Sequence, residues 1–255
     1  MPDDGTSSRI RQIAREHGLG EAPVLGTPVD FALALPYVRA LERKDGLTAA
    51  HTWRVTLYAR LLSEEFGLTH EQVNRIGVAA SLHDIGKLDI PDAVLMKPGK
   101  LTDEEFAIIK THPVKGHERL LALGVDDQIA LNLVRWHHER IDGKGYPDGV
   151  AGDKIPIGAR FFSVIDTFDA LTSIRPYRAD VGAGAGERAL EELHKGVGTR
   201  YAPEAVEAFC RLFRRGDLKW IMDYFNDGGD APGFEALSSA HQVRPASVIS
   251  PGAPR

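Results

Sequence analysis

Apolar residues recur with a helical period between residues 29 and 225, and this region shows no convincing β-strand alternation. Two pairs, Thr69 with Gln72 and Thr102 with Glu105, have the spacing of a capping box, which closes the first turn of a helix. The predicted helices are residues 48–66, a helix opening at Thr69, residues 102–112, a helix from Asp126 or Asp127, a helix after Pro156, and residues 187–195 and 203–214. The pattern predicts an all-α fold, a single helical bundle.

The helix expected over 102–112 should turn Phe106 and Ile109 inward. It should end at His112, because Pro113 disfavours a helical conformation at the residue before it. The two ends of the chain differ from the helical region. Residues 1–28 predict a loosely packed N-terminal arm, and residues 226–255, rich in Gly, Pro and Ser, predict a disordered tail.

The chain has 255 residues, which suits one large domain or two small ones. The apolar stretch from Phe31 to Val38 is interrupted by Pro36 and is too short to span a bilayer. The N-terminus lacks the apolar core of a signal peptide. We therefore expect no membrane span and a cytoplasmic location.

Composition is that of an ordinary globular protein, with 43% hydrophobic and 26% charged residues. The net charge of −5 argues against DNA or RNA as the main partner. Cys210 is the only cysteine, so an intrachain disulfide and an all-cysteine metal site are both excluded. The ten histidines are the unusual feature, because histidine is the commonest metal ligand.

Seven metal-ligating side chains fall on the apolar stripes or at the ends of the predicted helices. They are His51, His83, Asp84, His112, His137, His138 and Asp166. Any one of these histidines alone is more often a hydrogen-bonded core residue than a ligand. Seven together favour metal binding, since buried carboxylates are costly without a partner. The other histidines lie on polar faces, near caps or in the tail: His17, His70, His117, His194 and His241.

The ligand types narrow the choice of metal. All seven candidates offer imidazole nitrogen or carboxylate oxygen, and seven exceed the needs of one tetrahedral zinc. They suit two six-coordinate ions, iron or manganese, that share a bridging carboxylate. Two metal ions about 3.5–4 Å apart are a recurrent arrangement for phosphoester hydrolysis.

Several blocks of sequence resemble the HD-GYP domain family of the HD superfamily of metal-dependent phosphohydrolases. The blocks are residues 83–87 (HDIGK), 112–116 (HPVKG), 137–147 (HHERIDGKGYP), 166–173 (DTFDALTS) and 175–178 (RPYR). The resemblance implies an all-α domain that hydrolyses cyclic di-GMP to pGpG and, in some members, to GMP. Some members act on related cyclic dinucleotides.

The resemblance also implies roles for single residues. One metal would be held by His51, His83, Asp84 and Asp166, and the second by His112, His137 and His138, with Asp84 bridging and a bridging hydroxide as nucleophile. Lys87 would meet a phosphate oxygen, and Arg175, Arg178 and Tyr146 would contact the dinucleotide. Asp169 would support a ligand or contact the bridging water. Some members bind a third metal through a Glu where this chain has Leu47, so we expect two.

The loop from Asp142 to Pro147 has two interpretations. It is either a tight turn, since Gly143 and Gly145 permit positive φ, or a docking site for a protein partner such as a diguanylate-cyclase-type domain. Two alternatives to the phosphodiesterase also stay open. One is a regulatory module that binds the dinucleotide with little or no turnover, and the other is a phosphohydrolase for another nucleotide. The oligomeric state is open as well, a homodimer included.

Overall fold

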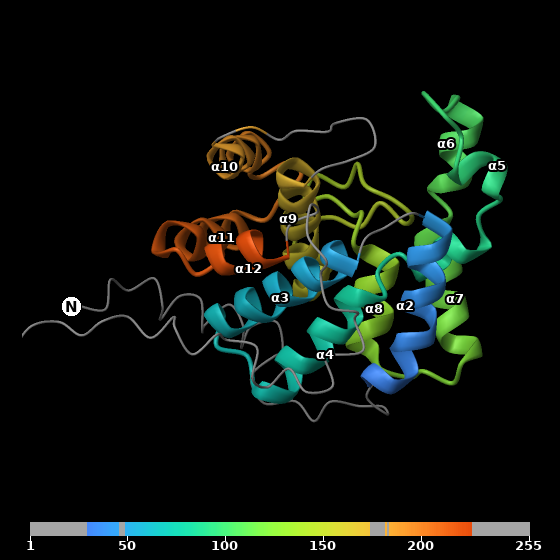
Figure 1. Ribbon diagram of the computed structural model, residues 1–255, viewed down its shortest axis with the longest axis horizontal. Helices are drawn as coiled ribbons and strands as arrows, with labels where there is room; N and C mark the ends of the chain where they lie inside the picture. The colour runs from blue at the N-terminus through green and yellow to red at the C-terminus, as the bar shows by residue number, and fades with distance from the viewer. Residues whose placement is uncertain (1–29, 46–48, 174–181, 183, 226–255) are drawn as a thin grey trace, which may run out of the picture.

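The computed structural model describes residues 30–45, 49–173, 182 and 184–225 (Figure 1). The helices are α2 (Phe31–Asp45), α3 (Ala49–Glu65), α4 (His70–Ser81), η1 (Ile85–Asp89), α5 (Asp92–Leu95), α6 (Asp103–Ile109), α7 (His112–Ala122), α8 (Gln128–Trp136), η2 (Gly152–Lys154), α9 (Ile157–Thr172), α10 (Ala185–Lys195), α11 (Pro203–Arg215) and α12 (Lys219–Tyr224). These described residues contain no named strand. The predicted all-α class is therefore confirmed.

Most predicted helix starts are found where the capping residues placed them. Both capping boxes form, with the Thr69 and Thr102 hydroxyls each accepting a backbone N–H three residues later. The Asp127 carboxylate caps α8 by accepting from the backbone nitrogens of Ile129 and Ala130. Short-range capping chemistry thus defines these boundaries.

The predicted helix over 102–112 is wrong in two respects. It breaks into α6 and α7, because Pro113 ends the first helix and then occupies the first turn of the second, where its missing N–H costs nothing. Phe106 is 47% exposed, and α6 buries none of its residues. The reason is tertiary: α5 and α6 project from the body of the protein, so this apolar stripe has little to pack against (Figure 1).

The core lies where α3 and α9 pack together, with α4 and α8 against one side and α10 and α11 against the other (Figure 1). Phe168 of α9 is fully buried and makes edge-to-face contacts with Tyr58 of α3 and Phe209 of α11. On the other side of the bundle, α7 packs on η1 and α8. This packing brings the polar ends of α4, α7 and α8 to the middle of α9.

The predicted arm (residues 1–28) and tail (residues 226–255) lie outside the described residues. In the part of the chain that is described, no helix has the length and apolar character needed to cross a membrane.

Candidate metal centre

The seven candidate ligands come from separate elements that meet at one place. His51 lies in the first turn of α3, His112 begins α7, and Asp166 lies in the middle of α9. The other four follow helix ends: His83 and Asp84 after α4, and His137 and His138 after α8. Five of the seven are buried, and His138 and Asp166 are half-buried. Seven polar groups on five segments therefore share a largely water-excluded region.

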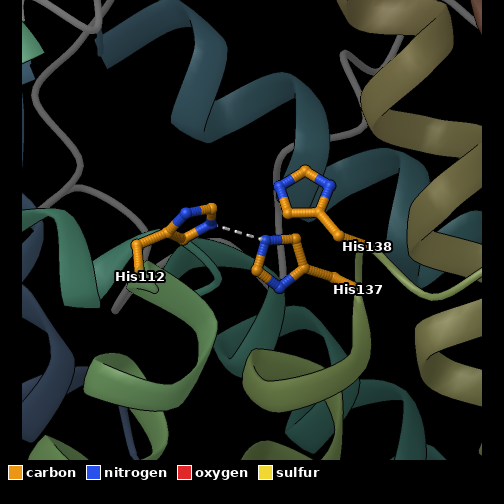
Figure 2. Close-up of side chains that lie close together, drawn as sticks. All are labelled: His112, His137 and His138. Atoms are coloured by element: carbon orange, nitrogen blue, oxygen red, sulfur yellow. Dashed lines mark hydrogen bonds between the residues drawn. The ribbon is translucent and has the colours of Figure 1, made fainter. Parts of the chain in front are cut away.

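The histidine rings form a continuous cluster. Neighbouring ring centroids are separated by 5.7 Å (His51–His83), 5.4 Å (His83–His137), 5.2 Å (His112–His137), 5.1 Å (His112–His138) and 4.2 Å (His137–His138). Three of them, His112, His137 and His138, each bring a ring nitrogen within 4.8 Å of the others (Figure 2). This trio therefore offers three donor nitrogens that lie close enough together to contact one metal ion.

Backbone hydrogen bonds fix the tautomer of three of these histidines. The Nδ1 atoms of His83, His112 and His137 lie 2.8–2.9 Å from the carbonyl oxygens of Ala80, Ile109 and Val134, each three residues earlier. A carbonyl can only accept, so each Nδ1 must carry the proton and donate it. In the neutral rings the Nε2 lone pairs are therefore the ones that face the cluster, as metal-ligating histidines require.

The approach of two such nitrogens points to a cation. His112 Nε2 and His137 Nε2 are 3.1 Å apart, although each ring already uses its Nδ1 proton elsewhere (Figure 2). Burial, reinforced by His138 and His112, holds the pKa of His137 well below its ordinary value, so that ring is neutral. Two ligands at right angles on one ion, with bonds of about 2.1 Å, would lie about 3.0 Å apart. The residues present fit a metal ion.

Asp84 faces two different histidines with its two oxygens. Its Oδ2 lies 3.0 Å from His83 Nε2, and its Oδ1 lies 3.2 Å from His112 Nε2. Burial alone would raise the pKa of Asp84, but His83 and Lys87 outweigh it and hold the pKa well below its ordinary value. The carboxylate is therefore ionised, with each oxygen directed at a different ligand, as a bridging position requires.

Lys87 lies at the edge of this cluster. Its Nζ donates to Asp84 Oδ2 at 2.9 Å and to Asp45 Oδ2, at the end of α2, at 2.7 Å. Burial alone would lower the pKa of Lys87, but the two carboxylates raise it by a larger amount. The net shift is therefore upward, and the ammonium stays charged. The sequence predicted Lys87 as a phosphate contact, and the structure shows it held beside the candidate bridging carboxylate.

Asp166 and Asp169 lie one turn apart on α9 and have different surroundings. Burial lowers the pKa of His138 to about 4, and the Asp166 carboxylate opposes that shift, so Asp166 lies within electrostatic range of the trio. Asp169 is completely buried and accepts a hydrogen bond from His51 Nδ1 at 2.8 Å. Two roles were predicted for Asp169, support of a metal ligand or contact with the bridging water. Its hydrogen bond to His51 has the geometry of the first role.

Tyr146 is brought to the cluster by its loop. Its ring stacks on His138 with centroids 4.7 Å apart, and its backbone N–H donates to the His138 carbonyl at 3.3 Å. The loop is closed by Glu139, whose buried carboxylate accepts from the backbone nitrogens of Asp148 and Gly149. Gly143 has φ 73°, as the tight-turn interpretation predicts, but Gly145 does not have positive φ. An added Cβ at Gly145 would lie 2.5 Å from the Arg140 backbone nitrogen, so this glycine is needed for a close backbone approach.

Two residues, Arg54 and Glu139, were missed as functional candidates in the sequence. Arg54 contacts Asp169, and a signal was available, since it falls almost one helical turn after His51 on the same inward stripe. The predicted substrate contacts Arg175 and Arg178, and Leu47 of the third-metal argument, lie outside the described residues.

Residues 37–205 match the family model of the HD domain. The chain belongs to the HD domain family and, with the motif blocks described above, to its HD-GYP members. Membership of this family implies binding of divalent metal ions, and the histidine cluster supplies the donors. The resemblance recognised in the sequence is therefore confirmed.

Particular relatives are similar over most of this chain. The cyclic di-GMP phosphodiesterase response regulator RpfG of Xanthomonas campestris is 43% identical over 198 residues, which is 76% of this chain and 50% of that protein. A cyclic di-GMP phosphodiesterase of Thermotoga maritima is 42% identical over 210 residues, 82% of this chain and 55% of the relative. The chain thus spans about half the length of these curated relatives.

Solved structures share the fold. A cyclic GMP-AMP-specific phosphodiesterase of V. cholerae (V-cGAP3) superimposes with a TM-score of 0.56 at 17% identity, over 80% of this chain and 54% of that one. Bd1817 of Bdellovibrio bacteriovorus, described as an HDG"Y"P protein, has a TM-score of 0.51 at 18% identity, over 82% of this chain and 70% of that one. At these identities the comparison supports the helical fold.

Proposed function

We propose that this domain hydrolyses cyclic di-GMP to pGpG, with GMP as a possible further product, at a centre of two divalent metal ions, iron or manganese. The observation that carries the proposal is the position of His112 Nε2, which lies 3.1 Å from His137 Nε2 and 3.2 Å from Asp84 Oδ1. Relatives named cyclic di-GMP phosphodiesterases, at 43% and 42% identity, support the choice of substrate.

The two predicted ligand sets share Asp84. The first comprises His51, His83, Asp84 and Asp166, and the second comprises His112, His137 and His138. The direction of the Asp84 oxygens toward His83 and His112, one from each set, supports this division. When bound, the metal ions would supply an activated water nucleophile and positive charge for the phosphoryl oxygens.

The protein's own residues orient and neutralise the substrate. The charged Lys87 ammonium, held between Asp84 and Asp45, can donate to a non-bridging phosphate oxygen next to the cluster. Tyr146, fixed against His138, presents its ring at the same side for contact with the dinucleotide. We retain Arg175 and Arg178 as predicted contacts to the dinucleotide, because guanidinium groups suit phosphate and guanine edges.

Substrate choice among cyclic dinucleotides needs a direct comparison. Another relative, 38% identical over 175 residues, is named a 3'3'-cGAMP-specific phosphodiesterase of Vibrio cholerae. Protein loaded anaerobically with Fe(II) or Mn(II) should therefore be assayed on cyclic di-GMP and 3'3'-cGAMP in parallel. Faster turnover of cyclic di-GMP supports the proposal, and turnover of 3'3'-cGAMP alone contradicts the substrate assignment.

A pair of histidine variants on one helix separates a metal-dependent reaction from contamination. His112→Ala should abolish hydrolysis, whereas His117→Ala, five residues along α7 and only half-buried, should leave it unchanged. Inactivity of the wild-type protein with two metal ions bound would contradict the proposal and favour the regulatory module. A protein partner at the loop from Asp142 to Pro147, a homodimer and a cytoplasmic location stay predictions from the sequence.

A further inference from the structure

Arg54 is a buried arginine, 4% exposed, that lies close to the metal centre without facing it. Its guanidinium donates in three directions. Nε donates to Asp169 Oδ1 at 2.5 Å, Nη2 to Ser173 Oγ at 2.8 Å, and Nη1 to the Phe225 carbonyl at 2.5 Å. Arg54 therefore joins α3 to both the end of α9 and the residue that follows α12.

The ion pair continues to a candidate metal ligand. Asp169 Oδ1 accepts from Arg54 Nε, and Asp169 Oδ2 accepts from His51 Nδ1 at 2.8 Å, from Ser173 Oγ at 3.1 Å and from Arg54 Nη2 at 3.3 Å. Asp169 has no solvent exposure, and an ionised carboxylate in such a place is costly unless a cation and hydrogen bonds compensate. With the proton held at Nδ1, the lone pair of the His51 ring lies on Nε2, the nitrogen that would ligate a metal.

The shape of arginine explains why this residue type stands here. A planar guanidinium carries five N–H donors in a fixed fork, so one side chain can hold a carboxylate, a hydroxyl and a carbonyl at the same time. Lysine has the same charge but a single nitrogen, and it cannot reach all three acceptors, which lie at the end of α9 and after α12. The orientation of Asp169 is therefore set from α3, α9 and the end of α12 together.

We propose that Arg54 is a positioning residue for one half of the metal centre. It fixes the Asp169 carboxylate, and this carboxylate holds the His51 ring in the orientation needed to ligate a metal. The inference rests on the proposed two-metal centre. It assigns the effect of Arg54 to the ion that His51 would bind and leaves the trio of His112, His137 and His138 unaffected.

The same contacts tie this half of the centre to the end of the domain. The Phe225 ring stacks on Trp53, the neighbour of Arg54, with centroids 5.0 Å apart, and it also contacts Trp220 of α12. The Phe225 carbonyl that Arg54 holds is thus kept in place by aromatic packing. Docking of α12 consequently supports the His51 side of the metal centre.

Metal binding by the full chain tests the proposal without relying on hydrolysis. Free Mn(II) is measured by electron paramagnetic resonance during titration of wild type, Arg54→Gln, Arg54→Lys and Arg60→Gln. Arg60 is the matched control, because it lies on the same helix and pairs with Asn74, away from the centre. Thermal unfolding of the metal-free proteins shows whether each variant folds.

We expect two ions per wild-type chain and unchanged binding in Arg60→Gln. Arg54→Gln should bind one ion as wild type does and the other about 10–100-fold more weakly, as when an outer partner of a ligand is lost. The affinity of Arg54→Lys for the weakened ion should lie between those of wild type and Arg54→Gln, since lysine keeps the charge of arginine but not its three hydrogen bonds. Wild-type binding of both ions by a folded Arg54→Gln overturns the proposal, as does equal weakening of both ions.

A second variant keeps the test valid if Arg54→Gln does not fold. Ser173→Ala removes one acceptor of the guanidinium and one donor to Asp169 Oδ2, so it loosens the network of Arg54 and Asp169 without leaving a buried charge unpaired. Selective weakening of one ion in Ser173→Ala supports the proposal, and unchanged binding of both ions overturns it. Absence of Mn(II) binding by the wild type would instead contradict the proposed two-metal centre itself, and the inference with it.

Discussion

Two glycines of the motif blocks face each other where η1 packs on α7. A methyl carbon added at Gly86 would lie 1.9 Å from the His112 carbonyl oxygen and 2.4 Å from the Gly116 backbone nitrogen. Carbon and oxygen atoms in contact are normally about 3.3 Å apart or more. Gly86→Ala should therefore push η1 and α7 apart by more than about 1 Å, because both clashing atoms belong to backbone.

The displacement should affect stability and the metal centre together. Overpacking of this kind costs about 1–3 kcal/mol, and a domain of this size loses about 2–4 °C in Tm for each kcal/mol. We therefore expect the Tm to fall by about 2–12 °C. His112 at the start of α7 lies 3.2 Å from Asp84, which directly precedes η1, so separation of η1 and α7 would change this distance. Metal sites tolerate displacements of their ligands of only about 0.5 Å. Mn(II) affinity should fall by about tenfold or more.

Thermal unfolding of metal-free protein and Mn(II) titration measure the two effects separately. Gly124→Ala at the other end of α7 is the matched control. At φ 77° with open space around it, alanine there should cost about 1–2 kcal/mol of backbone strain while metal binding stays unchanged. Wild-type Tm and Mn(II) affinity in Gly86→Ala would refute the reasoning. Loss of Mn(II) binding in Gly124→Ala would show that lowered stability alone explains the effect.

Three further outcomes are expected. Metal-free protein should lose stability as the pH falls from 6.5 toward 4, because burial lowers the pKa of His138 from 6.5 to about 4 and the unfolded chain therefore takes up this proton first. His138→Gln should flatten that part of a curve of Tm against pH, and an unchanged curve would contradict the assignment. Tyr146→Phe should keep the ring stack on His138 and wild-type Mn(II) affinity, whereas Tyr146→Ala should lower the affinity in the same titration; equal affinities would count against a role for the stack. Asp127→Asn should still cap α8 but lower the free energy of unfolding, measured in urea, by about 3 kcal/mol. The reason is that the buried Arg75 loses the carboxylate that lies 2.8 Å from its guanidinium, and a loss of stability near zero would contradict this.

The sequence predicted the candidate ligands because their signals are local. Each falls on an apolar stripe or at a helix end, and the motif blocks name them by family resemblance. The same local reasoning failed for Phe106, whose stripe is apolar but lies on a projecting helix. Periodicity reports which residues share a face, and it does not report whether another element covers that face.

The sequence alone therefore determined the helical class and the starts of several helices, and it predicted the candidate donor residues, since these depend on capping, periodicity and short motifs. The tertiary structure decided which nitrogens face one another and how Asp84 divides its oxygens between His83 and His112. It also decided that Arg54 reaches Asp169, 115 residues away, together with Phe225, 171 residues away. Contacts between residues so distant in sequence arise only when helices pack, because local sequence constrains each helix and not the distance between helices.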